Sequence, residues 1–257
     1  MKTLAVLPAR FASTRYPGKP LAIVAGKPMI QWVWEAAGKA GLDRVVVATD
    51  DERIAATVND FDGHVVFTDP ALPSGTDRVA ATLDKIGESF DAILNIQGDE
   101  PAMHPETIKS LVELMASDPS LPMGTAACPF NSFDDVFDPN NVKVVVGANN
   151  RALYFSRSPI PYLRDSASFD LDFRLWAGAD QLSLFRWHLG IYAYRPAVLR
   201  QITSLPPHPL EEFEKLEQLR ALAAGIAIGV AHTPHCSAGV DTPEDVGRAE
   251  KMLKNMA

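Results

Sequence analysis

Short, nearly continuous apolar runs alternate with helical patterns through the first half of the chain. The apolar runs are typical of strands buried on both faces of a sheet, and they cover residues 4–7, 44–48, 64–67 and 92–96. Amphipathic periodicity between them predicts helices over residues 28–40, 51–59, 76–86 and 105–116. This alternation predicts a doubly wound, mainly parallel α/β sheet, in which ligands bind beyond the carboxyl ends of the strands.

The second half of the chain has a mixed pattern. Two β-rich runs, residues 142–146 and 152–155, flank the turn signal Gly147-Ala-Asn-Asn150 and predict an antiparallel hairpin. After a Pro-rich, aromatic loop over residues 156–187, we expect strands over 189–194 and 226–232 and helices over 196–204, 210–224 and 243–255. Because the sequence has no Gly/Ser linker and no internal repeat, we predict one domain over residues 1–257 with a smaller antiparallel lobe inserted in it.

The overall charge and the length of the apolar runs narrow the classes of partner. The 257 residues include 24 Lys and Arg against 32 Asp and Glu, a net charge of −8, which argues against general nucleic-acid binding. The apolar stretch over residues 221–231 is much shorter than the ~20 residues that a membrane span needs, and the run Leu4–Pro8 is unlike a secretory signal. We therefore expect a cytoplasmic protein whose partners are small molecules, neither nucleic acid nor membrane.

Cysteine usage points to the same compartment. Cys128 and Cys236 are the two cysteines of the chain, too few for a disulfide framework. Cys128 lies in an apolar, strand-like stretch, which indicates an inert buried thiol. A reducing environment is therefore expected.

A loop rich in cations follows the first predicted strand. It carries Arg10, Arg15 and Lys19, while Ser13 and Gly18 allow the backbone to approach a ligand closely. Arginine binds phosphate oxygens through two donors, so the loop predicts an anion site. It has neither the spacing of a Walker loop nor a Gly-x-Gly-x-x-Gly motif. The alternative is a solvated basic loop with no ligand.

Six segments, in this order, carry a resemblance to a known family. They are Ser74-Gly-Thr-Asp-Arg78, Asn95-Ile-Gln-Gly-Asp-Glu-Pro101, Tyr154-Phe-Ser-Arg157, His188-Leu-Gly-Ile-Tyr192, Leu216-Glu-Gln-Leu-Arg220 and Gly239-Val-Asp-Thr-Pro-Glu-Asp245. Together with the opening loop, they resemble the 3-deoxy-D-manno-octulosonate (Kdo) cytidylyltransferases, sugar nucleotidyltransferases with a Rossmann-like fold. The resemblance implies transfer of CMP from CTP to the anomeric hydroxyl of Kdo with Mg²⁺, in a cytoplasmic homodimer that supplies lipopolysaccharide assembly.

The resemblance places the nucleotide in the first half, residues 1–130. It implies that the triphosphate is held by Arg10, Ser13, Arg15 and Lys19, and that Arg15 and Lys19 stabilise the departing pyrophosphate. Further nucleotide contacts are expected from residues at the ends of the third and fourth predicted strands, namely Ser74, Thr76, Arg78, Gln97 and Gly98. For Ser74 and Thr76, plain capping of the following helix is the alternative.

Two aspartates are the expected metal ligands. Mg²⁺ takes carboxylate and phosphate oxygens and keeps several waters, so Asp99 and Asp241 suffice with a triphosphate. Asp241 alternatively only supports the turn before the last helix. Because Thr242 can cap that helix, we favour metal binding for Asp241.

The acidic sugar is expected in the second half, residues 131–257. The resemblance implies that Arg157 or Arg164 meets the sugar carboxylate, while His188, Tyr192, Glu217 and Gln218 contact its oxygens. The alternatives are a structural histidine, a core aromatic ring and a solvated helix charge. Glu217 and Gln218 are adjacent, so on a helix they point about 100° apart and reach one pocket only from a broad face or a helix end.

One segment departs from the family. Residues 166–187 are longer and more hydrophobic than expected, and we hypothesise that they form part of a dimer contact; a lid or a change of sugar specificity is the alternative. Two rival functions also stay open. One is a cytidylyltransferase for another acidic sugar, such as 8-amino-Kdo or sialic acid, and the other is a noncatalytic nucleotide sensor on the same fold.

Overall fold

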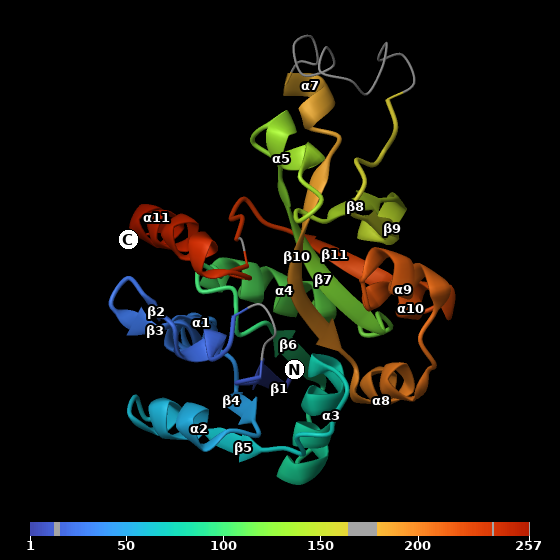
Figure 1. Cartoon of the computed structure of the whole chain (residues 1–257). Coiled ribbons are helices and arrows are strands. Elements are labelled where there is room, and N and C mark those ends of the chain that lie inside the picture. Colours follow the sequence, from blue (N-terminus) through green and yellow to red (C-terminus); the bar gives the residue numbers. More distant parts are fainter. Residues whose placement is uncertain (13–15, 164–178, 238, 257) are drawn as a thin grey trace.

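A central mixed sheet organises the chain. The computed structural model describes residues 1–12, 16–163, 179–237 and 239–256, and within this part the sheet has nine strands (Figure 1). Its main path runs β11-β7-β10-β6-β1-β4-β5, and β8 joins β10 to β9. The strands are β1 (Thr3–Ala9), β4 (Arg44–Thr49), β5 (Val65–Phe67), β6 (Ala92–Ile96), β7 (Met123–Pro129), β8 (Lys143–Val146), β9 (Ala152–Ser156), β10 (Arg186–Tyr194) and β11 (Ile228–His232). A separate short ribbon pairs β2 (Ile23–Val24) with β3 (Lys27–Pro28).

The strand β1 shows why the apolar runs are continuous. It pairs in parallel with β4 on one side and β6 on the other. Leu4 and Val6 pack in the apolar layer on one face of the sheet, and Ala5 and Leu7 pack in the layer on the opposite face. All four side chains are inaccessible to solvent, which confirms the prediction of strands covered on both faces.

Helices cover both faces of this sheet. The layer with Ala5 and Leu7 includes α1 (Met29–Lys39), α2 (Glu52–Asn59) and α4 (Pro105–Ser117), and the layer with Leu4 and Val6 includes α3 (Gly75–Ile86), α8 (Pro196–Ser204) and α10 (Gln218–Ala223). The last helix, α11 (Val246–Met256), packs against α1 and β2 in a smaller cluster. The doubly wound α/β prediction is confirmed.

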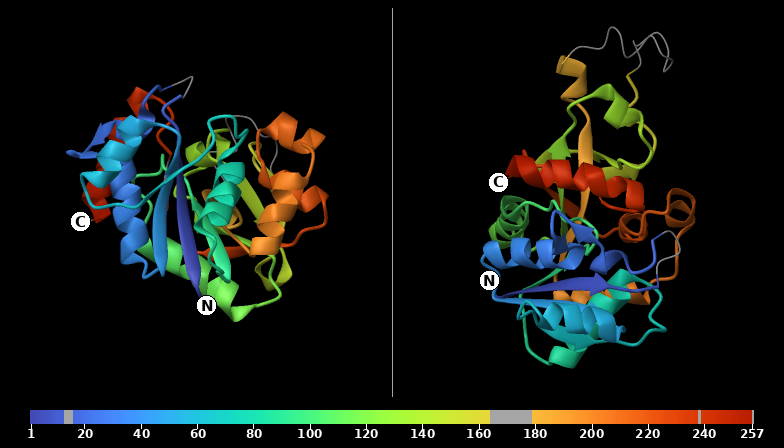
Figure 2. Two further views of the ribbon diagram at one scale, coloured as in Figure 1. Left: turned by 90° about the horizontal axis from the view of Figure 1, so that it is seen from below. Right: turned by 60° about the vertical axis from the view of Figure 1, so that its left-hand side comes forward.

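The second half of the chain supplies the middle of the sheet. Strand β10 lies antiparallel between β6 and β7, while β7 and β11 are parallel to each other. The predicted hairpin is confirmed as β8 and β9, and it adds to the sheet through β10. With α5 (Phe133–Phe137) and α7 (Ala179–Leu182), this hairpin forms a small lobe beyond the main sheet (Figures 1 and 2). Short 3-10 turns, η1 (Lys19–Leu21), η2 (Ala148–Asn150) and η3 (Pro243–Asp245), complete the described elements.

The prediction of one helix over residues 210–224 is wrong. The structure has α9 (Pro209–Glu214) and then α10, with a break between them. Lys215 ends α9 in the left-handed conformation, with φ 54°, which no α-helix continues. The break turns the amino end of α10, with Glu217 and Gln218, toward the site described below.

Cys128 is buried, as predicted, but the prediction that it is an inert thiol is wrong. Cys128 in β7 forms a disulfide with Cys236, which follows β11, with the Cα atoms 5.5 Å apart. Parallel pairing of β7 with β11 places Ala127 opposite His232, so the chain that leaves β11 passes the end of β7. A separation of 108 residues gives no sign of this proximity in the sequence.

The described helices are short relative to the ~20 apolar residues that span a bilayer. Within the part of the chain that the structure describes, none of them combines the length and the apolar character needed to cross a membrane.

Candidate active site

One large cavity lies where β6 ends. Its volume is about 680 Å³, and it is open to solvent along one side. Its walls bring together residues predicted from distant parts of the sequence, namely Gln97, Asp99, Arg157, His188, Tyr192, Glu217, Gln218 and Asp241. The cavity thus lies beyond the carboxyl end of β6, where ligands bind in sheets of this kind.

Lys19 joins the two predicted metal ligands. Its Nζ lies 2.6 Å from Asp99 Oδ2 and 3.3 Å from Asp241 Oδ1. Asp99 comes from the loop after β6, whereas Asp241 comes from the segment before α11, and Lys19 lies at η1. The Lys19 ammonium group therefore contacts two carboxylates, which lie 80 and 222 residues further along the chain.

The backbone around Asp241 is fixed by a neighbouring carboxylate. Asp245 Oδ2 accepts hydrogen bonds from the backbone N–H groups of Asp241 and Thr242, at 3.0 and 2.8 Å, and from the Thr242 hydroxyl at 3.1 Å. Thr242 and Asp245 form a capping box at η3. The turn is thus held by Thr242 and Asp245, and the Asp241 carboxylate is directed to Lys19 instead.

This pair of carboxylates fits a divalent cation. Both oxygen atoms lie within 3.3 Å of one cationic group, so they converge on a single position. Hard oxygen donors of this kind are what Mg²⁺ accepts, and a triphosphate would supply the remaining charged oxygens. Among the described residues, no three His, Cys, Asp or Glu side chains form a metal cluster, so a cation here would rely on its ligand for further contacts.

The predicted triphosphate loop is described in part. Arg10 Nη2 donates to the backbone oxygens of Leu72 and Ser74, at 2.5 and 3.0 Å, and so holds the loop before α3. Burial is the main cause that lowers the Arg10 pKa. Ser13 and Arg15 lie outside the described residues.

Ser74 caps a helix and also faces the second half of the chain. Its hydroxyl accepts a hydrogen bond from the Asp77 backbone N–H at 3.1 Å, so Ser74 caps α3 as the alternative interpretation expected. In addition, the Thr76 hydroxyl donates to Glu217 Oε2 at 2.8 Å. The predicted nucleotide segment and the predicted sugar segment are therefore in direct contact. Burial raises the pKa of Glu217, and the bond from Thr76 opposes this rise.

Arg78 is placed inside the protein. Its side chain is inaccessible to solvent and forms an ion pair with Asp50 at 3.0 Å and a short hydrogen bond to Thr68. In this arrangement the guanidinium group of Arg78 binds Asp50 and Thr68 and does not line the cavity. Its predicted role as a nucleotide contact stays a prediction.

Gly98 lies close to the backbone of another segment of the protein. A Cβ added to Gly98 would lie 3.2 Å from the backbone oxygen of Pro8 and 3.2 Å from Ile30 Cδ1. The glycine therefore lets the loop after β6 pack against the end of β1, where the cation loop begins. This holds Asp99 close to η1.

His188 and Tyr192 come from the central strand β10. His188 Nε2 lies 2.9 Å from the Thr125 hydroxyl, which donates to the Ile191 backbone oxygen at 2.8 Å. Since the hydroxyl has one proton, His188 donates from Nε2, and its Nδ1 is left as an acceptor. Burial lowers the His188 pKa to about 3, so the ring is neutral, and burial also raises the pKa of Tyr192.

The charged and amide side chains that are predicted to bind the sugar differ in how many hydrogen bonds they already form within the protein. Arg157 donates from Nε to the Glu214 backbone oxygen at 2.7 Å and from Nη1 to the Pro139 backbone oxygen at 3.0 Å. Gln218 is 4% exposed, and in the described part of the chain its Nε2 has no hydrogen-bond partner. Arg164 lies outside the described residues.

Several groups on the cavity wall were not predicted from the sequence. They are mostly polar or charged and include Glu100, Asp138, Asn140, Asn141, Lys215, Ser237 and Arg248. The signals that could have found them are weak, because single charges in turns are normally solvated. The adjacent pair Asn140-Asn141 just before a predicted strand was the clearest of these signals.

The chain is similar in sequence to known proteins over nearly its full length. The sequence profile of the family described as Cytidylyltransferase matches residues 4–228. The chain belongs to this family. Among curated members, 3-deoxy-manno-octulosonate cytidylyltransferase of Syntrophotalea carbinolica is 47% identical over 257 residues and is covered completely, as is this chain. The protein of the same name from Parabacteroides distasonis is 48% identical over 259 residues, with 99% of each chain covered.

Solved structures agree with this cytidylyltransferase assignment. The structure of CMP:2-keto-3-deoxy-manno-octonic acid synthetase complexed with CTP is 39% identical, with a TM-score of 0.87 over all of both chains. A glucose-1-phosphate thymidylyltransferase from Bacillus anthracis has a TM-score of 0.65 at 16% identity, covering all of this chain and 96% of that one, and shares the fold alone. The family resemblance of the six sequence segments is confirmed.

Proposed function

We propose that this cytidylyltransferase transfers CMP from CTP to the anomeric hydroxyl of 3-deoxy-D-manno-octulosonate and releases pyrophosphate. The hydroxyl oxygen forms a bond to the α-phosphorus, the bond from that phosphorus to the β-phosphate oxygen breaks, and the hydroxyl proton is lost to solvent. The observation that supports this most is one cavity whose walls carry Asp99 and Asp241, the two carboxylates that contact Lys19, together with most of the predicted sugar residues.

Two groups of residues suit the two substrates. Lys19, with Arg10 and Arg15 of the same loop, neutralises a triphosphate and the pyrophosphate that departs. His188 offers a neutral acceptor at Nδ1, and Gln218 offers at Nε2 a donor that has no partner among the described residues. Glu217 accepts hydrogen bonds from hydroxyl groups, as it does from Thr76. A polyhydroxylated acid would satisfy these groups, while Arg157 and Arg164 supply positive charge for its carboxylate.

We propose Mg²⁺ as the divalent cation, held by Asp99 and Asp241. When bound, it would neutralise phosphate charge and favour ionisation of the sugar hydroxyl. We further propose Ser74, Thr76, Gln97, Gly98 and Arg78 as the elements that shape the nucleotide side, with Arg78 acting from behind the loop. A cytoplasmic homodimer that supplies lipopolysaccharide assembly completes the proposal, and sedimentation at several concentrations measures the oligomeric state.

The test is an assay of pyrophosphate release. The protein is incubated with Mg²⁺ and CTP and, in separate reactions, with Kdo, 8-amino-Kdo or sialic acid, with UTP and ATP as control nucleotides. We expect release that requires both CTP and Kdo. Preferential use of another sugar would replace the acceptor, and nucleotide binding without release in any reaction would favour the sensor function.

Replacing Asp99 tests the metal role. We expect Asp99→Asn to lower kcat by roughly 10²-fold or more, because a ligand charge next to the reacting phosphates is lost, while CTP affinity measured calorimetrically in EDTA changes much less. Asp62→Asn, at an exposed turn, is the matched control and should behave as the wild type. Equal losses of kcat and of metal-free CTP affinity in Asp99→Asn would contradict a metal role.

A further inference from the structure

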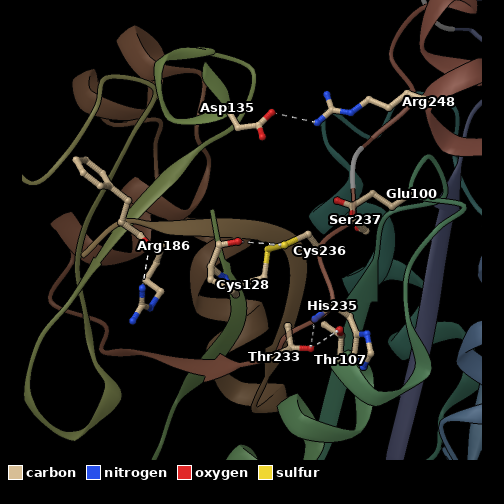
Figure 3. The surroundings of a disulfide bond; sticks show 12 residues. Glu100, Thr107, Cys128, Asp135, Arg186, Thr233, His235, Cys236, Ser237 and Arg248 are labelled. Carbon is tan, nitrogen blue, oxygen red and sulfur yellow. Dashed lines mark hydrogen bonds and ion pairs between the residues drawn. A yellow bond between two sulfur atoms is a disulfide. The ribbon is translucent and has the colours of Figure 1, made fainter. Parts of the chain in front are cut away.

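Glu100 is a buried carboxylate that the proposed chemistry does not use. It directly follows Asp99 and is 8% exposed. Its Oε1 accepts a hydrogen bond from the backbone N–H of Gly190 at 3.2 Å, and its Oε2 accepts a short one from the Ser237 hydroxyl. Both carboxylate oxygens are therefore engaged within the protein, by residues far apart in the sequence. Figure 3 shows Glu100 next to Ser237.

The contact with β10 depends on a missing side chain. A Cβ on Gly190 would lie 2.6 Å from Glu100 Oε1, closer than any ordinary contact. Gly190 lies where the pairing of β10 with β7 shifts register, between Leu189 and Tyr192. The carboxylate thus fills the space beside this irregularity, on the strand that carries His188 and Tyr192.

The contact with Ser237 ties down the segment that leads to Asp241. A second link runs in parallel, since the Val240 backbone N–H donates to the Asp99 backbone oxygen at 2.9 Å. Asp241 is the fourth residue after Ser237, and the Cys128–Cys236 disulfide fixes the residue before Ser237 to β7. The loop of Asp99 and the segment of Asp241 are therefore joined directly beside the point where their carboxylates meet Lys19.

We propose that Glu100 is a positioning residue that braces the Asp99 loop against Gly190 and Ser237 and thereby sets the affinity of the Asp99–Asp241 pair for a divalent cation. The brace also fixes β10, and with it the sugar groups, relative to that pair. This inference rests on the proposed function for the identity of the pair as cation ligands. Partners of this kind, one step removed from the ligands, typically contribute 10- to 100-fold to metal affinity or activity.

The test measures cation binding directly, with Mn²⁺ as a paramagnetic probe. Electron paramagnetic resonance gives the Mn²⁺ dissociation constant with CTP present and no sugar, and kcat and KM for Kdo are measured separately with Mg²⁺. We expect Glu100→Ala to weaken Mn²⁺ binding by about tenfold or more and to lower kcat in parallel. Glu100→Gln should stay within about threefold of the wild type, because its amide can accept from Gly190 and donate to Ser237.

A variant of the partner residue keeps the test independent of folding defects in Glu100→Ala. Ser237→Ala should weaken Mn²⁺ binding on its own but add little when combined with Glu100→Ala, since the two side chains act through one contact. The control is Glu35→Ala. Glu35 lies on α1, away from the cavity, and pairs with Lys27, so its loss should leave Mn²⁺ binding unchanged. Urea unfolding confirms that each variant is folded at the assay temperature.

Two results would overturn the inference. One is wild-type Mn²⁺ affinity in both Glu100→Ala and Ser237→Ala. The other is an equal loss in Glu100→Gln and Glu100→Ala, which would mean that the charge of the carboxylate matters and not its bridging contacts. Failure of the proposed function looks different, because the wild-type protein would then release no pyrophosphate from CTP and Kdo whatever its affinity for Mn²⁺.

Discussion

At the scale of single residues, burial decides the protonation of the site. His188 is held neutral because desolvation penalises the imidazolium ion, and its one resolved polar contact is with a hydroxyl, not a carboxylate. Burial likewise raises the pKa of Glu100 to about 7, although the hydrogen bond from Ser237 favours the charged form. The cavity therefore presents the neutral ring of His188 and, in the loop after β6, a buried carboxyl group held by Gly190 and Ser237.

Burial of His188 is expected to make the free energy of unfolding depend on pH. Its pKa falls from 6.5 in the unfolded chain to about 3 in the folded protein, so between these values the unfolded state binds more protons. Its contribution to stability is fully present above pH 6.5 and is lost as the pH falls toward 3. We expect the wild type to lose about 2 kcal/mol more free energy of unfolding than His188→Gln between pH 7 and pH 5.

Urea unfolding at the two pH values measures this difference. Comparing the variant with the wild type cancels the other titrating groups, including Glu100, whose raised pKa acts in the opposite direction. The same loss in both proteins would show that His188 is protonated in the folded state.

At the scale of elements, the break between α9 and α10 shapes the sugar side. Lys215 adopts φ 54°, and the backbone N–H at this position donates to the Glu211 oxygen as a helix end. A continuous helix would separate Glu217 and Gln218 by about 100° around its surface. The break instead puts both residues at a helix start, where Glu217 reaches Thr76 and Gln218 reaches the cavity wall.

Substitutions at Lys215 test this break. The left-handed conformation costs an ordinary residue roughly 1–2 kcal/mol and is worse for a β-branched one, whereas glycine adopts it freely. We expect Lys215→Gly to keep the free energy of unfolding within about 1 kcal/mol of the wild type, and Lys215→Val to lose roughly 1–2 kcal/mol. Chemical denaturation of the two variants gives the comparison, and equal stability would mean that the break relaxes easily.

At the scale of the whole molecule, the sheet order creates the site. Strand β10, from the second half of the chain, enters between β6 and β7 and runs against them. Strand β10 lies next to β6 in the sheet (Figure 1), and His188 and Tyr192 line the same cavity as Asp99. The two halves assigned to CTP and to sugar therefore share one sheet and one cavity.

The Cys128–Cys236 disulfide is expected to contribute to the stability of the whole molecule. Cys128 and Cys236 close a loop of 108 residues, and cross-links over such loops typically stabilise a folded protein by about 2–4 kcal/mol. We expect a phosphine reductant to lower the free energy of unfolding by about this amount. The double variant Cys128→Ala/Cys236→Ala should be insensitive to the reductant. Two titratable thiols in the untreated protein would contradict the bond.

The sequence determined the local structure and the chemical kinds of residue at the site. Continuous apolar runs predicted β1, β4, β5 and β6 because strands covered on both faces have no polar side, and the helices between them followed from their periodicity. Asp99 and Asp241 were predicted as metal ligands and Lys19 as a triphosphate contact, and the structure places both carboxylates within 3.3 Å of Lys19 Nζ. These features depend on short-range patterns or on recognisable motifs.

Only the tertiary structure decided which distant residues meet. The Glu100 brace, the pairing of Cys128 with Cys236 and the inward placement of Arg78 all depend on the order of strands in the sheet and on how chain segments pass its edge. Such contacts join residues tens to hundreds of positions apart, and burial, which sets their protonation, exists only once the layers are packed. Residue type and spacing carry no record of either.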